Sequence, residues 1–81
     1  MDYEKELQLR DCLARNLRYL RISRSPCLSQ KMLAKKLGVT QKSISRYENA
    51  KCLPPTHVLV ALAGEFGLTT DALFMERPQK I

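Results

Sequence analysis

The 81-residue sequence predicts an all-α fold, and three observations support this prediction. Apolar residues recur at steps of three and four along the chain, which is the period of helices. Glycine and proline are sparse and punctuate the periodic segments. No segment has the alternating pattern of a strand. A chain of this length forms one domain, with a core too small for a deep substrate cleft.

The first expected helix covers roughly residues 6–23. One apolar stripe runs along it at steps of four, four and three, formed by Leu9, Leu13, Leu17 and Leu20. Pro26 ends this segment, because proline lacks a backbone N–H and cannot continue a helix.

Two short helices are expected next, separated by a tight turn. Ser29 is suited to cap the first, because its hydroxyl can accept a hydrogen bond from a free N–H, and Gly38 suits a left-handed residue after its end. Thr40 is suited to cap the second, which covers roughly residues 41–49. Two helices joined by a turn that contains glycine form a helix-turn-helix, here at about residues 29–49.

A fourth helix is expected after the Pro54-Pro55 pair, with Gly67 at its end. Thr69 caps a brief fifth helix, in which Asp71 lies favourably in the first turn. The apolar residues of these two helices are Val58, Leu59, Leu62, Ala63, Phe66, Leu73 and Phe74. The expected organisation is an N-terminal extension of residues 1–8, one domain of residues 9–75 and a tail of residues 76–81.

The charge of the chain is concentrated in its middle. The formal net charge is +6, and residues 15–51 hold ten basic residues and one acid, a net +9 that leaves −3 for the remainder. A concentrated basic segment indicates a polyanionic partner, nucleic acid before an anionic membrane surface. A solvated helix surface with no ligand remains the alternative on composition alone.

Catalytic and metal-binding chemistry has little support in the residue types present. His57 is the only histidine, no nucleophile stands near it at a motif spacing, and no glycine-rich phosphate loop occurs. Cys12, Cys27 and Cys52 lack the Cys-x-x-Cys spacing of zinc sites, so a zinc site requires the fold to gather three thiols and one imidazole. We expect no enzyme, cofactor, metal site or small-molecule substrate, an exposed His57, and thiols that serve as small buried hydrophobes.

The expected location is the cytoplasm. No run approaches the ~20 apolar residues of a membrane span, and the acidic start of the chain lacks the apolar stretch of a signal peptide. Three cysteines, an odd number, favour reduced thiols. Binding to a membrane surface would use the apolar residues that this small core needs.

The third expected helix has two different faces. At 100° per residue, Ile44 and Tyr47 lie on one side with Glu48 beside them. The opposite side holds long hydrogen-bonding side chains, Lys42, Arg46 and Asn49. The second helix divides in the same way, with Leu33 and Leu37 inward and Lys31 and Lys35 outward.

A helix with such a face fits the major groove of DNA. Gln41 can read adenine, Lys42 or Arg46 can read guanine, and Ser43 is small enough to accept either base. The N-terminal amides of the second helix suit a phosphate. Four residues around the two helices are expected to contact phosphates: Gln30, Thr40, Asn49 and Lys51.

Many residues match one known family in register over roughly residues 9–74. They are Leu28-Ser29-Gln30, Leu33-Ala34, Leu37-Gly38-Val39-Thr40, Ile44-Ser45, Tyr47-Glu48-Asn49 and Leu62-Ala63. Together they resemble the phage Cro and repressor (XRE-type) helix-turn-helix family. The resemblance implies a compact five-helix bundle of the lambda-repressor-like DNA-binding type, with residues 41–49 as the recognition helix.

The resemblance also implies roles for single residues. It places Gln30 on a phosphate and Gln41, Lys42, Ser43 and Arg46 at base edges. In this family the glutamate at the position of Glu48 pairs with an arginine late in the first helix. Arg21 fits that place, with Arg18 as the alternative.

The sequence departs from the family pattern at two places. The segment 22–27 is about two residues longer than usual. Ala50 stands where the family often has glycine, and a Cβ disfavours a left-handed residue, so we expect a different path into Lys51.

The expected function is sequence-specific binding of double-stranded DNA by a transcriptional regulator, with repression the expected action. A homodimer that reads a pseudo-palindromic operator is expected, joined through the fourth and fifth helices or the chain ends. The alternative is a protein-interaction or antitoxin-like module on the same fold, with an exposed apolar patch formed by Leu68, Leu73, Phe74 and Met75.

Overall fold

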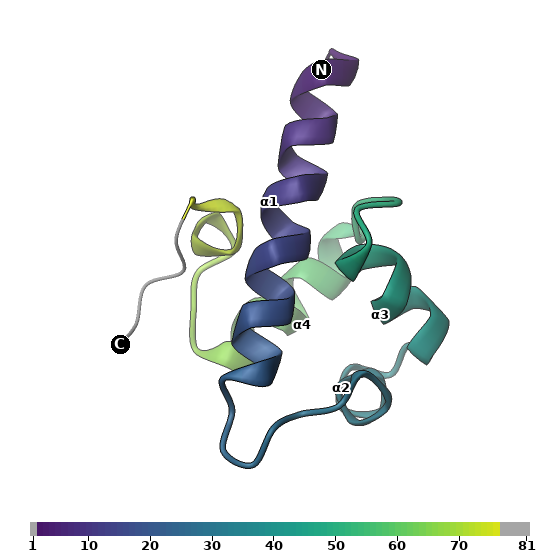
Figure 1. Cartoon of the computed structure of the whole chain (residues 1–81), viewed down its shortest axis with the longest axis vertical. Coiled ribbons are helices and arrows are strands. Elements are labelled where there is room, and N and C mark those ends of the chain that lie inside the picture. Colours follow the sequence, from purple (N-terminus) through teal and green to yellow (C-terminus); the bar gives the residue numbers. More distant parts are fainter. Residues whose placement is uncertain (1, 77–81) are drawn as a thin grey trace.

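The computed structural model describes residues 2–76 and folds them into four α-helices and one short 3₁₀ helix (Figure 1). In chain order these are α1 (Tyr3–Ile22), α2 (Gln30–Leu37), α3 (Gln41–Glu48), α4 (Thr56–Phe66) and η1 (Asp71–Phe74). No strand occurs among the described residues, and the all-α fold class is confirmed. The fifth element corrects the expected helix count. It is a 3₁₀ turn of four residues, too short for a regular α-helix.

One apolar core joins all five elements. Each element contributes at least one large side chain with no exposed surface: Leu13, Leu17, Leu33, Ile44, Leu62 and Leu73. Leu73 therefore closes the core and is not part of an exposed patch. Leu68 and Phe74 are half-buried and Met75 is exposed, so the four residues expected to form a patch do not share one surface.

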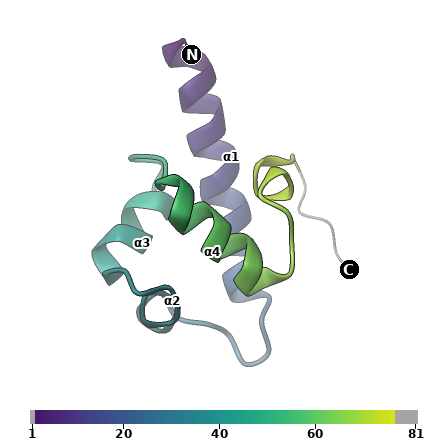
Figure 2. The same ribbon diagram turned by 180° about the vertical axis from the view of Figure 1, so that it is seen from behind.

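Helix α1 begins three residues earlier than expected. The carboxylate of Asp2 accepts a hydrogen bond from the backbone N–H of Lys5 at 2.8 Å and caps the helix. Residues 3–8, expected as an extension, form the first turns of α1, which rise beyond the other helices in both views (Figures 1 and 2). The division into extension, domain and tail stays a prediction, and residues 77–81 lie outside the described residues.

The two caps predicted for the middle helices are present. The hydroxyl of Ser29 accepts a hydrogen bond from the N–H of Met32 at 3.0 Å, and that of Thr40 accepts one from the N–H of Ser43 at 3.1 Å. Gly38 is left-handed, with φ of 72°, and ends α2 as predicted.

Ala50 corrects the prediction made for the end of α3. It is left-handed, with φ of 57°, although a Cβ costs about 1–2 kcal/mol in this region. Two backbone hydrogen bonds offset the cost: the N–H of Lys51 donates to Arg46 at 3.0 Å and that of Ala50 donates to Tyr47 at 3.3 Å. The chain therefore turns after α3 in the same way as it turns after α2 at Gly38.

Polar contacts of Arg24 fix the segment between α1 and α2. Its guanidinium donates to the backbone carbonyl of Glu65, lies 3.2 Å from the Glu65 carboxylate and stacks over the ring of Phe66, 5.0 Å from its centre. Lys36 approaches the same carboxylate at 3.9 Å. The longer connection is thus anchored to the C-terminal end of α4, where cations are favourable.

Side chains of α1 also hold η1. The buried Asn16 amide donates to the carbonyls of Leu73 at 2.8 Å and Met75 at 2.6 Å. The Cys12 thiol donates to the carbonyl of Phe74 at 2.9 Å. Cys12 and Cys52 are half-buried and Cys27 is exposed, so the expectation of buried thiols is wrong for Cys27. It lies in the connection between helices and outside the core.

Candidate nucleic-acid interface

Helices α2 and α3 form one rigid unit around a three-residue turn. Leu33 and Ile44 are fully buried between them and the rest of the core, and α3 packs against α1 through Ile44 and Tyr47. The ribbon shows both helices on the same side of α1, with η1 on its other side (Figure 1). The outer face of α3 is therefore open to solvent.

The residues predicted to read bases lie at the start and along the outer face of α3. Gln41, Lys42 and Arg46 are exposed, and the first turn of the helix holds no acidic residue. Ser43 is half-buried, and its hydroxyl accepts a hydrogen bond from the Thr40 hydroxyl at 3.0 Å. Three long hydrogen-bonding side chains are thus exposed on one helix, whereas the Ser43 hydroxyl is partly occupied by its hydrogen bond with Thr40.

The helix-turn-helix and the residue that follows Ala50 carry five exposed cations, and none forms an ion pair within residues 2–76: Lys31, Lys35, Lys42, Arg46 and Lys51. Unpaired cations in one segment create a positive potential that attracts a polyanion. The four ion pairs of the described chain involve other residues, so the charge of these cations is not neutralised from within.

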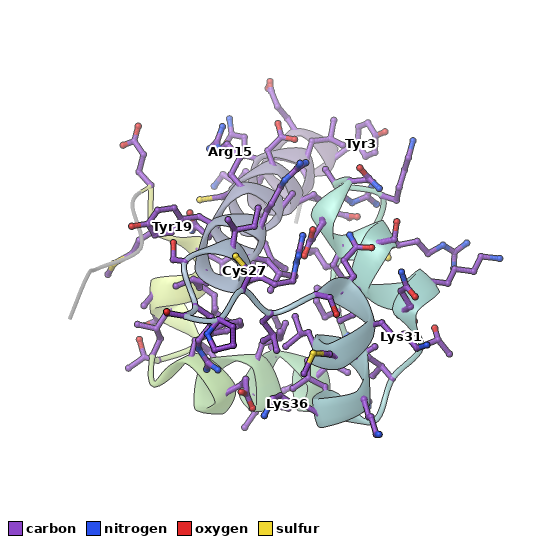
Figure 3. All side chains as sticks on the ribbon, turned by 60° about the horizontal axis from the view of Figure 1, so that its bottom comes forward. Tyr3, Arg15, Tyr19, Cys27, Lys31 and Lys36 are labelled. Atoms are coloured by element: carbon purple, nitrogen blue, oxygen red, sulfur yellow. The ribbon has the colours of Figure 1, made fainter. Side chains whose placement is uncertain are left out.

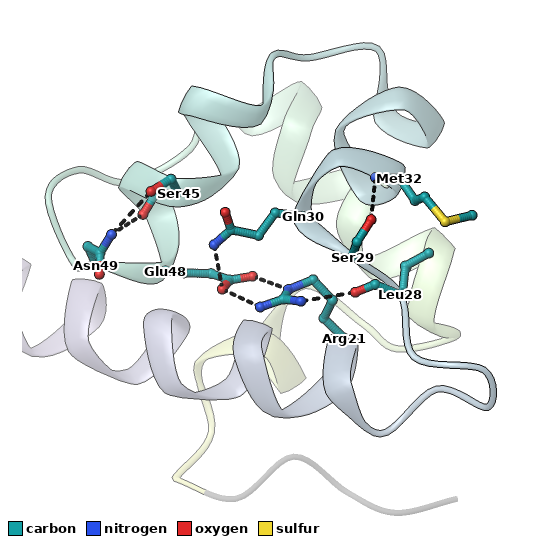
Figure 4. A network of polar contacts seen from close by, with 8 residues as sticks. All are labelled: Arg21, Leu28, Ser29, Gln30, Met32, Ser45, Glu48 and Asn49. Carbon is teal, nitrogen blue, oxygen red and sulfur yellow. Dashed lines mark hydrogen bonds and ion pairs between the residues drawn. The ribbon is translucent and has the colours of Figure 1, made fainter.

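A buried ion pair joins the helix-turn-helix to α1 (Figure 4). The Nε of Arg21 lies 2.6 Å from one oxygen of Glu48, and its Nη2 lies 2.9 Å from the other. The remaining Nη1 donates to the carbonyl of Leu28 at 3.0 Å. The hydrogen bond to Glu48 raises the pKa of Arg21. Arg21 therefore stays charged, and the pair joins α1, α3 and the chain before α2.

Gln30 belongs to the same network. Its Nε2 donates to Glu48 at 3.0 Å, which orients the amide at the start of α2. The hydroxyl of Ser29 already binds Met32, whereas the N–H groups of Gln30 and Lys31 have no partner in the described chain. Such free N–H groups suit an anion. The link from Gln30 to Glu48 spans 18 residues, and no sequence pattern indicated it.

The structure also engages two further predicted phosphate-contacting residues internally. The Asn49 amide donates to the carbonyl of Ser45 at 2.9 Å and to its hydroxyl at 3.2 Å, so a phosphate contact would replace one of these bonds. Thr40 caps α3 through its hydroxyl. Lys51 follows the left-handed Ala50 and is exposed beside the end of α3.

Tyr47 supports α3 from below. Its ring is buried in the core, and this burial raises the pKa of its hydroxyl above the usual value, with Cys52 contributing. His57 is exposed, as predicted. Among residues 2–76, no group of three His, Cys, Asp or Glu side chains could hold a metal ion, and no helix is long and apolar enough to cross a membrane.

Two short helices joined by a tight turn, with donors on the outer face of the second, define the helix-turn-helix class of DNA-binding proteins. A family described as Helix-turn-helix matches residues 27–73, more than half of the chain, and the protein belongs to this XRE-type, Cro/repressor-like family. It is therefore a DNA-binding regulator of a family that is typically not enzymatic. No curated protein and no solved structure matches the chain.

Proposed function

We propose that the protein is a transcriptional repressor that acts in the cytoplasm and binds a pseudo-palindromic operator in double-stranded DNA as a homodimer. The observation that carries this proposal is the outer face of α3, where Lys42 and Arg46 are exposed beside Gln41 without an acidic neighbour in the first turn. A helix with this face fits the major groove.

In the proposed complex the base edges are read by four residues of α3. Gln41 forms two hydrogen bonds with an adenine, and Lys42 or Arg46 donates to N7 and O6 of a guanine. Ser43 is small enough to lie close to the base pairs between them. Each such pair discriminates against the wrong base by about 1–3 kcal/mol.

Phosphates on either side of the groove are bound around this helix. The free N–H groups at the start of α2 and the amide of Gln30 bind one phosphate, with Glu48 and Arg21 as the residues that position Gln30. Thr40, Asn49 and Lys51 bind others. Two copies would place their α3 helices about 34 Å apart, one turn of the duplex, which matches two half-sites.

The test is a titration of labelled duplex DNA across a range of salt concentrations. Lys42→Ala/Arg46→Ala should bind at least about tenfold more weakly, because two groove contacts are lost. Lys5→Ala, which removes an exposed cation from α1, serves as the matched control and should bind like the wild type. Shallow salt dependence with equal binding by all three proteins would contradict the proposal and favour a protein-interaction or antitoxin-like module.

A further inference from the structure

Helix α1 carries an unusual share of the exposed apolar surface. Seven large apolar side chains are exposed among the described residues, and four of them are on α1: Tyr3, Leu7, Tyr19 and Ile22. The buried residues of α1 all lie between Leu13 and Leu17, so its first turns have no core beneath them. A helix end without tertiary packing is marginally stable in water. A partner that packs along α1 would supply that support.

Four exposed residues of α1 have a palindromic spacing. Leu7, Asp11, Arg18 and Ile22 follow one another at steps of four, seven and four. At 100° per residue they fall within about 60° of each other, so they share one face. The order is apolar, acidic, basic, apolar. When these four positions face a reversed copy of themselves, Leu7 meets Ile22 and Asp11 meets Arg18.

A shallow hollow on the surface of α1 fits the same arrangement. It lies between Arg15, Arg18, Tyr19, Ile22 and Ser23, and its lining is mainly apolar. The side chains of Arg15 and Tyr19 point away from the helical body around it (Figure 3). In the reversed register Leu7 of the other copy lies opposite Ile22, and Asp11 lies opposite Arg18, both of which line the hollow. A leucine side chain can pack on the apolar lining beside Ile22.

We propose that α1 pairs antiparallel with α1 of a second copy of this chain. Leu7 packs against Ile22 of the second copy, and Asp11 forms an ion pair with its Arg18; the two-fold symmetry repeats both contacts. The pairing specifies the interface of the proposed homodimer, and its role in DNA binding rests on that proposed function. Neither Asp11 nor Arg18 has a hydrogen-bond or ion-pair partner within residues 2–76, so both charges are free to bind across the interface.

The pairing leaves the DNA-binding face open. Helix α3 packs against a different side of α1 through Ile44 and Tyr47, and Lys42 and Arg46 point away from that contact. A single pair of helices buries less than the about 800 Å² per partner of a standard interface. The dimer is therefore weak in solution and is reinforced when two copies bind adjacent half-sites.

Sedimentation equilibrium without DNA tests the pairing, from about 10 µM to about 1 mM protein, the range in which weak contacts associate. The wild type should change from monomer to dimer. Asp11→Arg and Arg18→Asp should each shift the midpoint at least about tenfold higher, because each places like charges together. The combined variant Asp11→Arg/Arg18→Asp restores opposite charges and should associate like the wild type.

A matched control separates this surface from α4. Val60→Glu places a charge on an apolar residue of α4 that is 58% exposed, and it should leave association unchanged. Three results would each overturn the pairing. The wild type could stay monomeric at all concentrations, the double variant could associate as weakly as the single variants, or only Val60→Glu could lose the dimer. Because no DNA is present, the result is independent of the proposed operator binding. Lys42→Ala/Arg46→Ala should dimerise normally, although its affinity for DNA is reduced.

Discussion

Arg21 and Glu48 meet through two hydrogen bonds, at 2.6 Å and 2.9 Å, across 27 residues of chain. The Glu48 side chain is only 3% exposed, and it also accepts the hydrogen bond from Gln30. One carboxylate thus links the helix that supports the DNA-binding unit with the residue proposed to bind a phosphate. This relation makes the stability of the fold and the geometry of the proposed site depend on the same pair.

Removing one partner of this pair should cost much stability. Glu48→Ala leaves the Arg21 guanidinium largely buried without its counterion, and we expect a loss of about 3 kcal/mol in the free energy of unfolding. Arg21→Met/Glu48→Leu removes both charges and should lose clearly less free energy of unfolding than Glu48→Ala does. Urea unfolding measures both values. A double variant that loses as much stability as Glu48→Ala would contradict this expectation.

The left-handed Ala50 offers a stabilising substitution. Glycine carries no Cβ penalty at positive φ, so Ala50→Gly should raise the free energy of unfolding by about 1 kcal/mol. Gly38→Ala is the reverse change at the equivalent position of α2 and should lower it by a similar amount. Thermal and urea unfolding of the two variants test both expectations. An Ala50→Gly variant less stable than the wild type would contradict the backbone geometry after α3.

The raised pKa of Tyr47 predicts a loss of stability in alkali. Its ordinary value is 10.0, and burial raises the pKa in the folded state. Above about pH 10 the unfolded chain therefore releases this proton before the folded chain does, so stability falls as the pH rises. Tyr47→Phe lacks the proton and should show a smaller fall. Urea midpoints measured between pH 9 and about pH 11 test this, and equal slopes for both proteins would contradict it.

Arg46 and Lys51 should differ in what they contribute to DNA binding. Arg46→Ala should lose about 1–3 kcal/mol on the preferred site and less on random duplex, because a base contact is lost. Lys51→Ala should weaken binding to all DNA similarly and reduce the salt slope by about one. Titrations with both kinds of duplex measure these losses. Equal losses on specific and random DNA for both variants would remove the distinction.

Local signals in the sequence predicted most of the fold. Contacts between distant side chains did not follow from it, except the Arg21–Glu48 pair, which the family resemblance implied. Ser29, Gly38 and Thr40 were predicted as caps because each acts within a few residues of the chain. The start of α1 at Tyr3 was missed because its first turns have no buried face and so no apolar period.

The site was predictable to the extent that it lies on one helix. The outer face of α3 follows from helical spacing alone. The hydrogen bond from Gln30 to Glu48 and the anchoring of Arg24 on Glu65 depend on how separate helices pack, and no spacing encodes them. Ala50 shows a further limit, since its conformation is determined by backbone hydrogen bonds that outweigh the preference of the residue itself.

Selection of binding sites from random duplex DNA, followed by titration of the selected site and a scrambled control, tests sequence-specific repression most directly. Repression through a symmetric operator predicts a recovered pseudo-palindrome with half-sites about one helical turn apart. It should be bound at least ~10³-fold more tightly than the control. Recovery of no common sequence, with equal binding to both duplexes, would contradict sequence-specific regulation.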